Sequence, residues 1–407
     1  MKICHLSYSD TVGGAARAAY RIHQALGARG EDSRMVVSSA MTGDWTVRGP
    51  KGALAKAMPK VRSELASFLT KALKTGNPIT HSPAVVPSRW SNRLNASDAD
   101  VIHLHWINSE MLSVADIGKF KKPVVWTLHD MWAFCGAEHL ASDYRWRDGY
   151  TADNRPAHES GFDLNRWTSA RKQKHWKHPI HIVAPSRWLA TCARQSVLMR
   201  EWPITVIPNT IDTDVWQPVD KSIARQLLHL PPDVPLLLFG GWGGINVEHK
   251  GLDLLQAALN HLSGQLRGLE LVMLGQLAPR VPGEIGFPVH FTGHLHDDIS
   301  LQALYSAVDA VVVPSRQEAF GQTASEAHAC GTPVVAFNAT GLMDVVEHQK
   351  TGYLAKAFDP VELAIGLCWV LDDAARRVAL GRAARARAVQ LWSYKTVAEQ
   401  YLNCYSN

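Results

Sequence analysis

Two glutamates that follow the apolar run AVVVPS carry the clearest chemistry in this sequence. The run reads as a strand and Gly321 as the start of a helix, which puts Glu318 in the loop between them and Glu326 about one turn inside the helix. Such a helix start leaves the backbone N–H groups of Phe320, Gly321 and Gln322 free for a phosphate or a sugar oxygen. A carboxylate one turn further in can accept both hydroxyl groups of a ribose. The spacing alone also fits a solvated loop charge and a capping residue.

The elements that would position these residues alternate along the chain. Short apolar, β-branched runs begin at Ile3, Met35, Val101, Pro123 and His181, and a second series begins at Pro235, Leu269, Pro288, Ala310 and Pro333. Helical patterns separate the runs, which predicts an α/β chain with two parallel sheets. A segment rich in Pro, Asn and Asp from Thr205 suits a connection between domains. We expect domains at 1–204 and 205–389, with a helix in 390–407 that docks back on the first.

Composition excludes several classes of protein. With 407 residues, 46% hydrophobic and 19% charged, the chain is too apolar for a disordered or fibrous protein and long enough for two or three domains. A net charge of +5 is too mild to indicate nucleic acid and fits anionic small substrates or an anionic membrane surface. The six cysteines form no CxxC pair, and the sequence has no signal-peptide core and no apolar run of membrane-spanning length. We therefore expect a cytoplasmic protein.

Seven motifs follow one another in a fixed order. They are a Gly13-Gly14 turn, VIHLHW from Val101, WTLHD from Trp126, VAPSRW from Val183, VIPNTIDTDVWQP from Val206, HKGLDLLQAAL from His249, and the Glu318 to Glu326 segment followed by AHACGTPVVA. Together they resemble the retaining GT-B glycosyltransferases, in particular glycosyltransferase family 4, over nearly the whole chain. The resemblance implies two Rossmann-like domains that face a central cleft, and a metal-independent enzyme without a cofactor.

The resemblance also implies roles for the residues around the two glutamates. Glu326 would bind the ribose of the nucleotide and Glu318 a hydroxyl of the donor sugar. The backbone amides of Phe320, Gly321 and Gln322 would bind the sugar or the pyrophosphate.

The phosphate contacts show one departure from the family pattern. Lys250 in HKG matches the lysine that neutralises the pyrophosphate, although a lone lysine at a helix start also fits a solvated side chain. The arginine that the family places shortly before this lysine is missing from the turn around Trp242. Either Arg316, from the facing loop, or the backbone amides of the glycine-rich turn that includes Gly241 would supply the missing interaction.

The N-terminal half offers a second group of candidate residues. Gly13 and Gly14 follow the first strand and let the backbone approach a ligand closely, although they also fit a tight turn. His129 ends the strand WTLHD; the resemblance implies that it contacts the donor sugar and orients the acceptor, while a lone histidine also fits a structural role. The following loop with Glu138 and His139 resembles the acceptor side of polysaccharide-assembly members. The His-x-His pairs lack a third ligand, so we predict no metal site.

The sequence and the resemblance together favour a retaining hexosyltransferase. It would move a hexose from a UDP- or GDP-linked donor to a glycan or polyprenyl-linked acceptor in surface polysaccharide or O-antigen assembly. Two alternatives stay open: an isomerase similar to the nucleotide-sugar 2-epimerases, and a non-catalytic nucleotide-sugar binding protein, which the missing arginine suggests.

One helical segment, residues 54–75, bears on the partners of the protein. It places Val61, Leu65, Phe68, Leu69 and Leu73 on one face and Lys60, Arg62, Lys71 and Lys74 around the other. Such a basic amphipathic helix fits peripheral contact with the inner face of the plasma membrane. It also fits an ordinary surface helix packed on its own domain.

Overall fold

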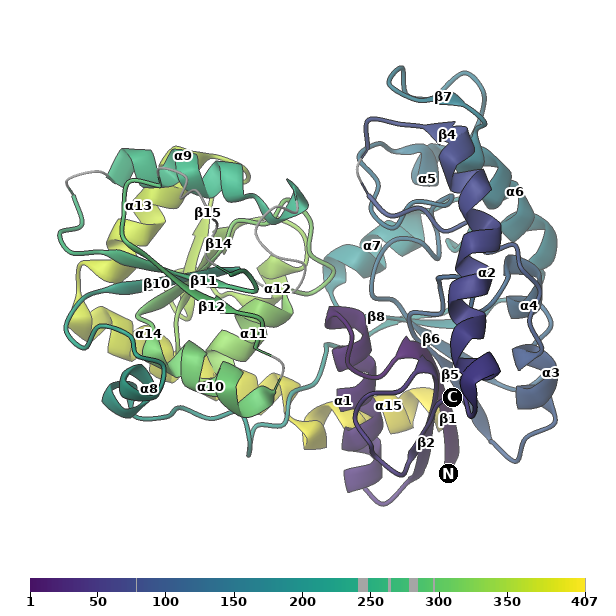
Figure 1. The fold of residues 1–407 in the computed structure, drawn as a ribbon, viewed down its shortest axis with the longest axis horizontal. Helices are drawn as coiled ribbons and strands as arrows, with labels where there is room; N and C mark the ends of the chain where they lie inside the picture. The colour runs from purple at the N-terminus through teal and green to yellow at the C-terminus, as the bar shows by residue number, and fades with distance from the viewer. Residues whose placement is uncertain (78, 241–247, 263–264, 278–284, 296, 407) are drawn as a thin grey trace. The chain divides into compact units, whose positions relative to one another are not determined.

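The chain folds into two compact units, each built on its own sheet (Figure 1). The computed structural model describes all residues except 78, 241–247, 263–264, 278–284, 296 and 407. The first unit comprises Met1–Pro208 and Val397–Asn407, and the second comprises Asn209–Thr396. We expected the division after residue 204, and the structure has it after Pro208.

The first unit contains a seven-stranded parallel sheet in the order β3-β2-β1-β5-β6-β8-β9. Its strands are β1 (Lys2–Ser9), β2 (Asp32–Ser39), β3 (Val47–Arg48), β5 (Val101–Leu104), β6 (Val124–Thr127), β8 (His181–Ala184) and β9 (Ile204–Val206). The chain first builds the sheet outward from β1 in one direction and then from β5 in the other. Ligands of such sheets bind at this reversal, beyond the carboxyl ends of the strands.

Helices cover the first sheet, and one of them, α2, is largely exposed. They are α1 (Gly14–Ala28), α2 (Ala53–Ala72), α3 (Trp90–Asn95), α4 (Val114–Ile117), α5 (Arg145–Asp148), α6 (Leu164–His175), α7 (Arg187–Gln195) and α15 (Tyr394–Ser406); β4 (Leu73–Lys74) and β7 (Ser160–Gly161) form a small antiparallel pair. In α1 one apolar side, formed by Ala18, Ile22 and Ala25, is fully buried. In α15, Tyr401 bonds to Thr127 of β6 at 3.0 Å.

The structure corrects the apolar face that we expected for α2. Leu73 directly follows α2 and is buried against Ala137 and Leu164, and Leu69 packs against the same cluster. Val61, Leu65 and Phe68 are exposed. The expected face is therefore divided, because the helix packs on its unit through one edge of that face only. None of the described helices combines the length and the apolar character that crossing a bilayer requires.

The second unit repeats the architecture with a six-stranded parallel sheet in the order β12-β11-β10-β13-β14-β15. Its strands are β10 (Leu236–Gly240), β11 (Glu270–Leu274), β12 (Val289–Gly293), β13 (Ala310–Val313), β14 (Val334–Phe337) and β15 (Gly352–Ala355); its helices are α8 (Lys221–Leu227), the short 3₁₀ helix η1 (Glu248–Lys250), α9 (Leu252–Leu262), α10 (Asp298–Ala307), α11 (Gln322–Ala329), α12 (Leu342–Val345), α13 (Pro360–Leu371) and α14 (Ala374–Trp392). Both sheets have the Rossmann order, so the prediction of two such domains is confirmed.

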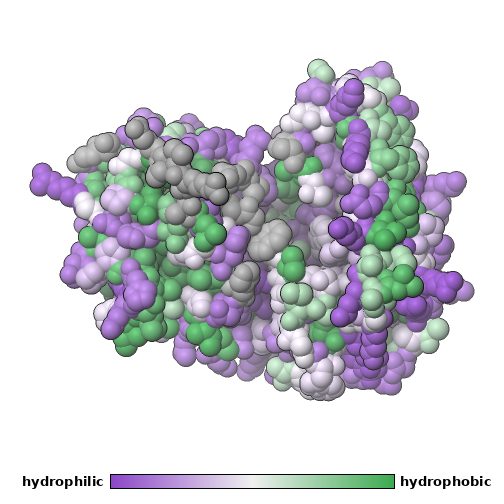
Figure 2. Space-filling model, viewed as in Figure 1, coloured by the Kyte–Doolittle hydropathy of each residue, from purple (hydrophilic) through white to green (hydrophobic). Residues whose placement is uncertain are grey.

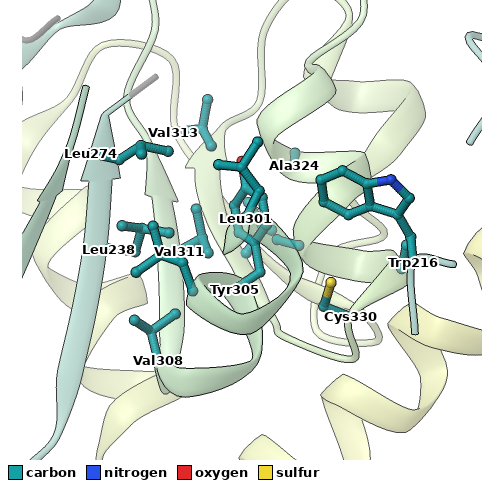
Figure 3. Close-up of a cluster of buried hydrophobic side chains, with 14 of the residues drawn as sticks. Trp216, Leu238, Leu274, Leu301, Tyr305, Val308, Val311, Val313, Ala324 and Cys330 are labelled. Carbon is teal, nitrogen blue, oxygen red and sulfur yellow. The ribbon is translucent and has the colours of Figure 1, made fainter. Parts of the chain in front are cut away.

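Alternation along the strands divides the core of the second unit into two layers. Leu236 and Leu238 of β10 belong to one apolar cluster, and Leu237 and Phe239 belong to the other. Successive side chains of a strand point to opposite faces, so both faces of the sheet are buried. Figure 3 shows the first cluster, in which strand residues meet Tyr305 of α10 and neighbouring side chains. This packing fixes β13 and α11, the two elements that flank the predicted donor segment.

Candidate functional site

An ion pair joins Lys250 at the end of η1 to Glu318 in the loop that follows β13. Glu318 accepts a hydrogen bond from the Lys250 ammonium at 2.7 Å and from the Ser315 hydroxyl at 2.9 Å, both through Oε1. Both charged side chains are largely buried. Burial opposes ionisation of Glu318, but the Lys250 charge and the two hydrogen bonds outweigh it and hold the pKa of this carboxyl below its usual value. Oε2 of Glu318 has no partner among the described residues, so it can accept a hydroxyl group.

A close backbone contact brings Lys250 to this glutamate. Gly251 has a φ of +74°, and a Cβ atom there would overlap the carbonyl oxygen of Pro314. The backbone N–H of Arg316 donates to the His249 carbonyl at 2.8 Å. Glycine in the HKG motif therefore lets the segment 248–251 lie against the loop after β13, and this contact positions the ammonium.

Arg316 does not stand free beside the phosphate-binding candidates. Its guanidinium forms a bidentate pair with Asp253 of α9, at 2.8 and 2.6 Å, and also donates to the Glu248 carbonyl. The charge is thus already paired, and the side chain ties the loop to the start of α9. A phosphate role for Arg316 would require this pair to break. The other candidate, Gly241, lies outside the described residues, as does Trp242.

The N-terminus of α11 presents backbone donors next to the ion pair. Gly321 is the N-cap at a φ of +104°, and a Cβ there would lie 2.7 Å from the Leu342 side chain. The Phe320 side chain is buried in the core, so only its backbone can reach a ligand. The N–H groups of Phe320 and Gly321 have no acceptor among the described residues, which suits them to a phosphate or a sugar oxygen.

Glu326 lies one turn inside α11, as expected, and is deeply placed. Its side chain is 6% exposed, and the Tyr305 hydroxyl donates to its Oε2 at 3.0 Å. Gln322, at the first position of the helix, is partly exposed. The sequence offered no signal for Tyr305, which reaches Glu326 from another helix, α10.

In the first unit, a chain of three histidines ends at His129. His5 Nδ1 lies 3.0 Å from His105 Nε2, and His105 Nδ1 lies 3.1 Å from His129 Nε2. Burial lowers the pKa of His129 to about 4, and burial likewise lowers the pKa of His5 and His105 well below the usual value. The three rings are therefore neutral at pH 7. His129 and His105 line a small pocket together with Trp106 and Asn108.

The hydrogen bonds of this chain define which nitrogen of His129 carries its proton. A neutral imidazole has one N–H donor and one acceptor nitrogen. His5 Nε2 is buried without a partner among the described residues. An unpaired acceptor is better tolerated than an unpaired N–H, so the protons point from His5 toward His129. His129 then accepts through Nε2 and can donate Nδ1–H to a ligand.

Most ring nitrogens of the histidine cluster are engaged in hydrogen bonds, which makes the cluster a poor metal site. Nitrogen atoms of His5, His103 and His105 lie within 4.8 Å of one another. His103 already bonds to Thr127 through Nε2 and to Tyr405 through Nδ1. Both nitrogens of His105 are engaged in the chain described above, so a cation would have to replace several existing bonds.

Asp130 belongs to a buried network. It accepts from His139 Nδ1 at 2.6 Å, and His139 Nε2 contacts the Ser82 hydroxyl at 2.8 Å and the Asn108 amide at 3.0 Å. The order Ser82, His139, Asp130 resembles a hydrolytic triad. However, Ser82 is only 5% exposed and Asn108 also occupies the histidine nitrogen, so no substrate carbonyl can reach the serine. We interpret the network as the support of the pocket wall.

The loop that follows His129 is fixed from within. Glu138 is buried, accepts from the Tyr150 hydroxyl, and has a pKa that burial raises above its usual value. The buried Lys172 donates to the carbonyl oxygens of Cys135 at 3.0 Å and Gly136 at 2.8 Å. The predicted acceptor loop is thus held in shape from within by the bond of Tyr150 to Glu138 and by the bonds of Lys172 to the backbone.

Gly13 lies at the carboxyl end of the first strand of the sheet. It caps α1 at a φ of +88°, and Gly14 is the first residue of the helix. The preceding loop is shaped by Asp10, whose carboxylate accepts from the backbone N–H groups of Met41 and Thr42. Both glycines therefore lie where the strand order reverses, the position at which ligands of this fold bind.

Comparison with known proteins identifies the family of this chain. The model described as "Glycosyltransferase Family 4" matches residues 12–215, half of the chain. The model described as "Glycosyl transferases group 1" matches residues 235–373. The chain belongs to glycosyltransferase family 4. The motifs that suggested this family are spread over both matched segments.

Relatives of this family 4 chain match part of their length. A D-inositol 3-phosphate glycosyltransferase of Xylanimonas cellulosilytica is 36% identical over 219 residues, which cover 50% of this chain and 51% of the relative. One of Segniliparus rotundus is 32% identical over 213 residues, 50% of this chain and 46% of the relative. The chain thus spans about half the length of these curated relatives.

Solved structures confirm the expected GT-B fold. Sucrose-phosphate synthase from Thermosynechococcus elongatus superimposes with a TM-score of 0.71 at 21% identity, over 100% of this chain and 98% of that one. Anabaena HepE, solved with UDP and glucose, gives a TM-score of 0.65 at 20% identity over the full length of both chains. WaaG, a glycosyltransferase involved in lipopolysaccharide biosynthesis, gives 0.65 at 18% identity, again over both full chains.

Proposed function

We propose that this protein is a retaining glycosyltransferase that moves a hexose from a nucleotide diphosphate sugar to a hydroxyl group. The observation that carries the proposal is the ion pair of Lys250 and Glu318 beside the backbone N–H groups of Phe320 and Gly321, which lead into α11. A cation, an anion and a helix N-terminus that lie beside one another match the charges of a diphosphate and the hydroxyls of a sugar.

Each group has a distinct task in the proposed reaction. Lys250 has three N–H donors and uses one for Glu318 among the described residues, so the others can bind the departing diphosphate. Glu318 accepts a sugar hydroxyl through Oε2, and Glu326 accepts the ribose hydroxyls. His129 donates Nδ1–H to the transferred sugar. The bond from the anomeric carbon to the diphosphate breaks as the acceptor oxygen attacks the same face, and the acceptor proton passes to the leaving phosphate oxygen.

In this mechanism the protein supplies charge and position and no nucleophile. Donors that are already oriented stabilise the developing negative charge without reorganising during the reaction. The lysine and the helix amides would do this without a metal ion or another cofactor. Activity that survives EDTA is therefore expected.

We propose the donor more specifically than the acceptor. HepE was solved with UDP-glucose, which favours a UDP-hexose donor, and GDP-linked sugars stay in the panel. For the acceptor we propose a glycan or polyprenyl-linked glycan of surface polysaccharide or O-antigen assembly, at the cytoplasmic side of the membrane. WaaG supports this context through its role in lipopolysaccharide biosynthesis. D-inositol 3-phosphate is the competing acceptor, because the curated relatives are named for it.

Nucleotide release and thermal stability test the proposal together. We would measure unfolding temperature with UDP-glucose, UDP-galactose, UDP-N-acetylglucosamine, GDP-mannose and NAD, because a ligand at 100 times its Kd adds about 2.7 kcal/mol of stability. Glu326→Gln should lose the shift, and Glu318→Gln should lose nucleotide release with either acceptor class. Full turnover by Glu318→Gln would refute the assignment.

Product analysis without an acceptor separates the alternatives. An epimerase converts the sugar of its donor alone, whereas a transferase needs the acceptor. Asp130 and Glu138, which an epimerase could use as acid and base, are both engaged in internal hydrogen bonds, and this favours the transferase. A non-catalytic binding protein would bind the donor and release no nucleotide with any acceptor.

A further inference from the structure

Helix α2 exposes a continuous apolar stripe. Leu54, Met58, Val61, Leu65 and Phe68 recur at intervals of four and three residues, and their exposed fractions run from 42% to 78%. At 100° per residue these positions share one side of the helix. In Figure 2 the surface over α2 carries hydrophobic residues beside hydrophilic ones. Large apolar side chains gathered in this way mark a surface that is covered in use.

The orientation of the stripe is fixed by the opposite edge of the helix. Arg62 donates to the backbone carbonyls of Val86, Pro87 and Glu110, each at 2.7 Å. Ala66 is the one buried residue among the described residues of α2. These contacts hold the helix on its unit with the stripe turned outward, so exposure of the stripe does not require any rearrangement.

The net positive charge of the chain is concentrated on the same segment. Residues 51–74 contain six of the 42 Lys and Arg residues and one of the 37 Asp and Glu residues, which leaves 36 of each for the remainder of the chain. The whole excess of five positive charges therefore belongs to α2 and its flanks. Lys60 and Lys71 lie about a third of a turn from the centre of the stripe, on the side away from Ala66. Both are exposed.

We propose that α2 docks this protein on an anionic phospholipid bilayer, with the stripe in the boundary between headgroups and acyl chains and the lysines at the phosphates. Long lysine side chains can bury their methylene stems and keep the ammonium at the headgroup level. A second copy of the chain is the weaker fit, because two such helices would bring equal positive charges together. The inference does not depend on the proposed transferase activity.

Vesicle flotation tests this surface directly. The full chain should float with vesicles of phosphatidylcholine containing 30% phosphatidylglycerol, and should float weakly with phosphatidylcholine alone. Replacing Lys60 and Lys71 by Gln should weaken partitioning roughly 25-fold, at about fivefold for each charge near the surface. The same substitution at exposed Lys174 and Lys177 is the matched control and should leave partitioning unchanged.

A second pair of variants tests the apolar stripe. Leu65→Asp with Phe68→Asp should abolish flotation, while Ile299→Asp with Val378→Asp, at similarly exposed positions of the second unit, should not. All variants should keep the unfolding temperature of the parent within a few degrees, because the replaced side chains are exposed.

Two results would overturn the proposal. The first is binding to anionic vesicles that is absent in the parent or unaffected by either α2 variant. The second is a dimer in sedimentation that Leu65→Asp with Phe68→Asp dissociates, which would assign the stripe to a second copy. Donor binding, measured without vesicles, should be equal in all variants, so failure here is distinguishable from failure of the proposed function.

Discussion

Removing either partner of the Lys250 and Glu318 pair should destabilise the protein. The two losses added together should exceed the loss from removing both partners at once. Glu318→Gln keeps the hydrogen bond from Ser315 but leaves the ammonium without its counter-ion, and Lys250→Met leaves a largely buried carboxylate. Each single variant should lose about 1.5–3 kcal/mol of the free energy of unfolding, the range for hydrogen bonds to charged groups. The double variant removes both charges and should lose less than the sum.

The coupling energy can be bounded from the exposure of the pair. The two side chains are 26% and 16% exposed, between surface pairs, which contribute about 0–1 kcal/mol, and fully buried pairs, where losing one partner costs about 3–5 kcal/mol. We expect a coupling of about 1–3 kcal/mol. The pair of Lys350 and Glu347, at a similar 2.8 Å but with side chains that are 67% and 42% exposed, is the matched control, with an expected coupling below about 0.5 kcal/mol.

The assay is urea unfolding of all four members of each cycle, at pH 7.5 and at acid pH. The pKa of Glu318 in the folded protein lies below its ordinary value of 4.5, so the pair contributes its full stabilisation above that value. The contribution is lost as pH falls through the folded pKa, and the coupling should shrink there. A coupling no larger than that of the control, or one that persists in acid, would refute the reasoning.

Three further predictions concern groups around the two sites. Gly251→Ala should destabilise the protein by more than the backbone strain of about 1–3 kcal/mol, because the new Cβ would also overlap the Pro314 carbonyl. Gly268→Ala, at a φ of +71° in open space, should cost the strain alone. Equal losses in urea unfolding would contradict the close contact of Gly251 with Pro314. His105→Leu should lower kcat/KM about tenfold and His105→Asn should restore most of it, because the amide can replace the nitrogen bonded to His129; equal activities would rule out a positioning role. Tyr305→Phe should weaken donor affinity more than turnover, since it removes a hydrogen bond that positions the Glu326 carboxylate; an unchanged KM for the donor would count against it.

The local structure of the predicted donor segment could be inferred from the sequence because its signals are local. The apolar strand, the glycine that opens the helix and the two glutamates lie within one short stretch, and the structure places them as strand, loop and helix. Lys250 lies 68 residues before Glu318, and only the family resemblance connected the two. No periodicity in the sequence could show that Gly251 lets those two loops touch, because the contact depends on the pairing of β10 with β13.

The amphipathic pattern of α2 was visible, but its direction was not. The sequence groups Leu73 with Val61 and Phe68 on one face, and the structure buries Leu73 and exposes the others. Periodicity identifies a stripe and cannot tell which edge of it meets the rest of the domain. That edge is set by the bonds of Arg62 to three carbonyls from two other segments, which are tertiary contacts.

The histidine chain shows how far strand order could have extended the prediction. His5 lies in the apolar run from Ile3, whereas His105 and His129 belong to two separate motifs, and each histidine alone fits a structural residue. The Rossmann order, once accepted from the alternating pattern, makes β1, β5 and β6 neighbours, and the observed register sets His5 beside His103. His105, two positions after His103 and just beyond β5, must then lie at the carboxyl end of the sheet, level with the end of β6. The contact from His105 to His129 therefore follows from topology and register together, and spacing along the sequence was insufficient because it contains neither.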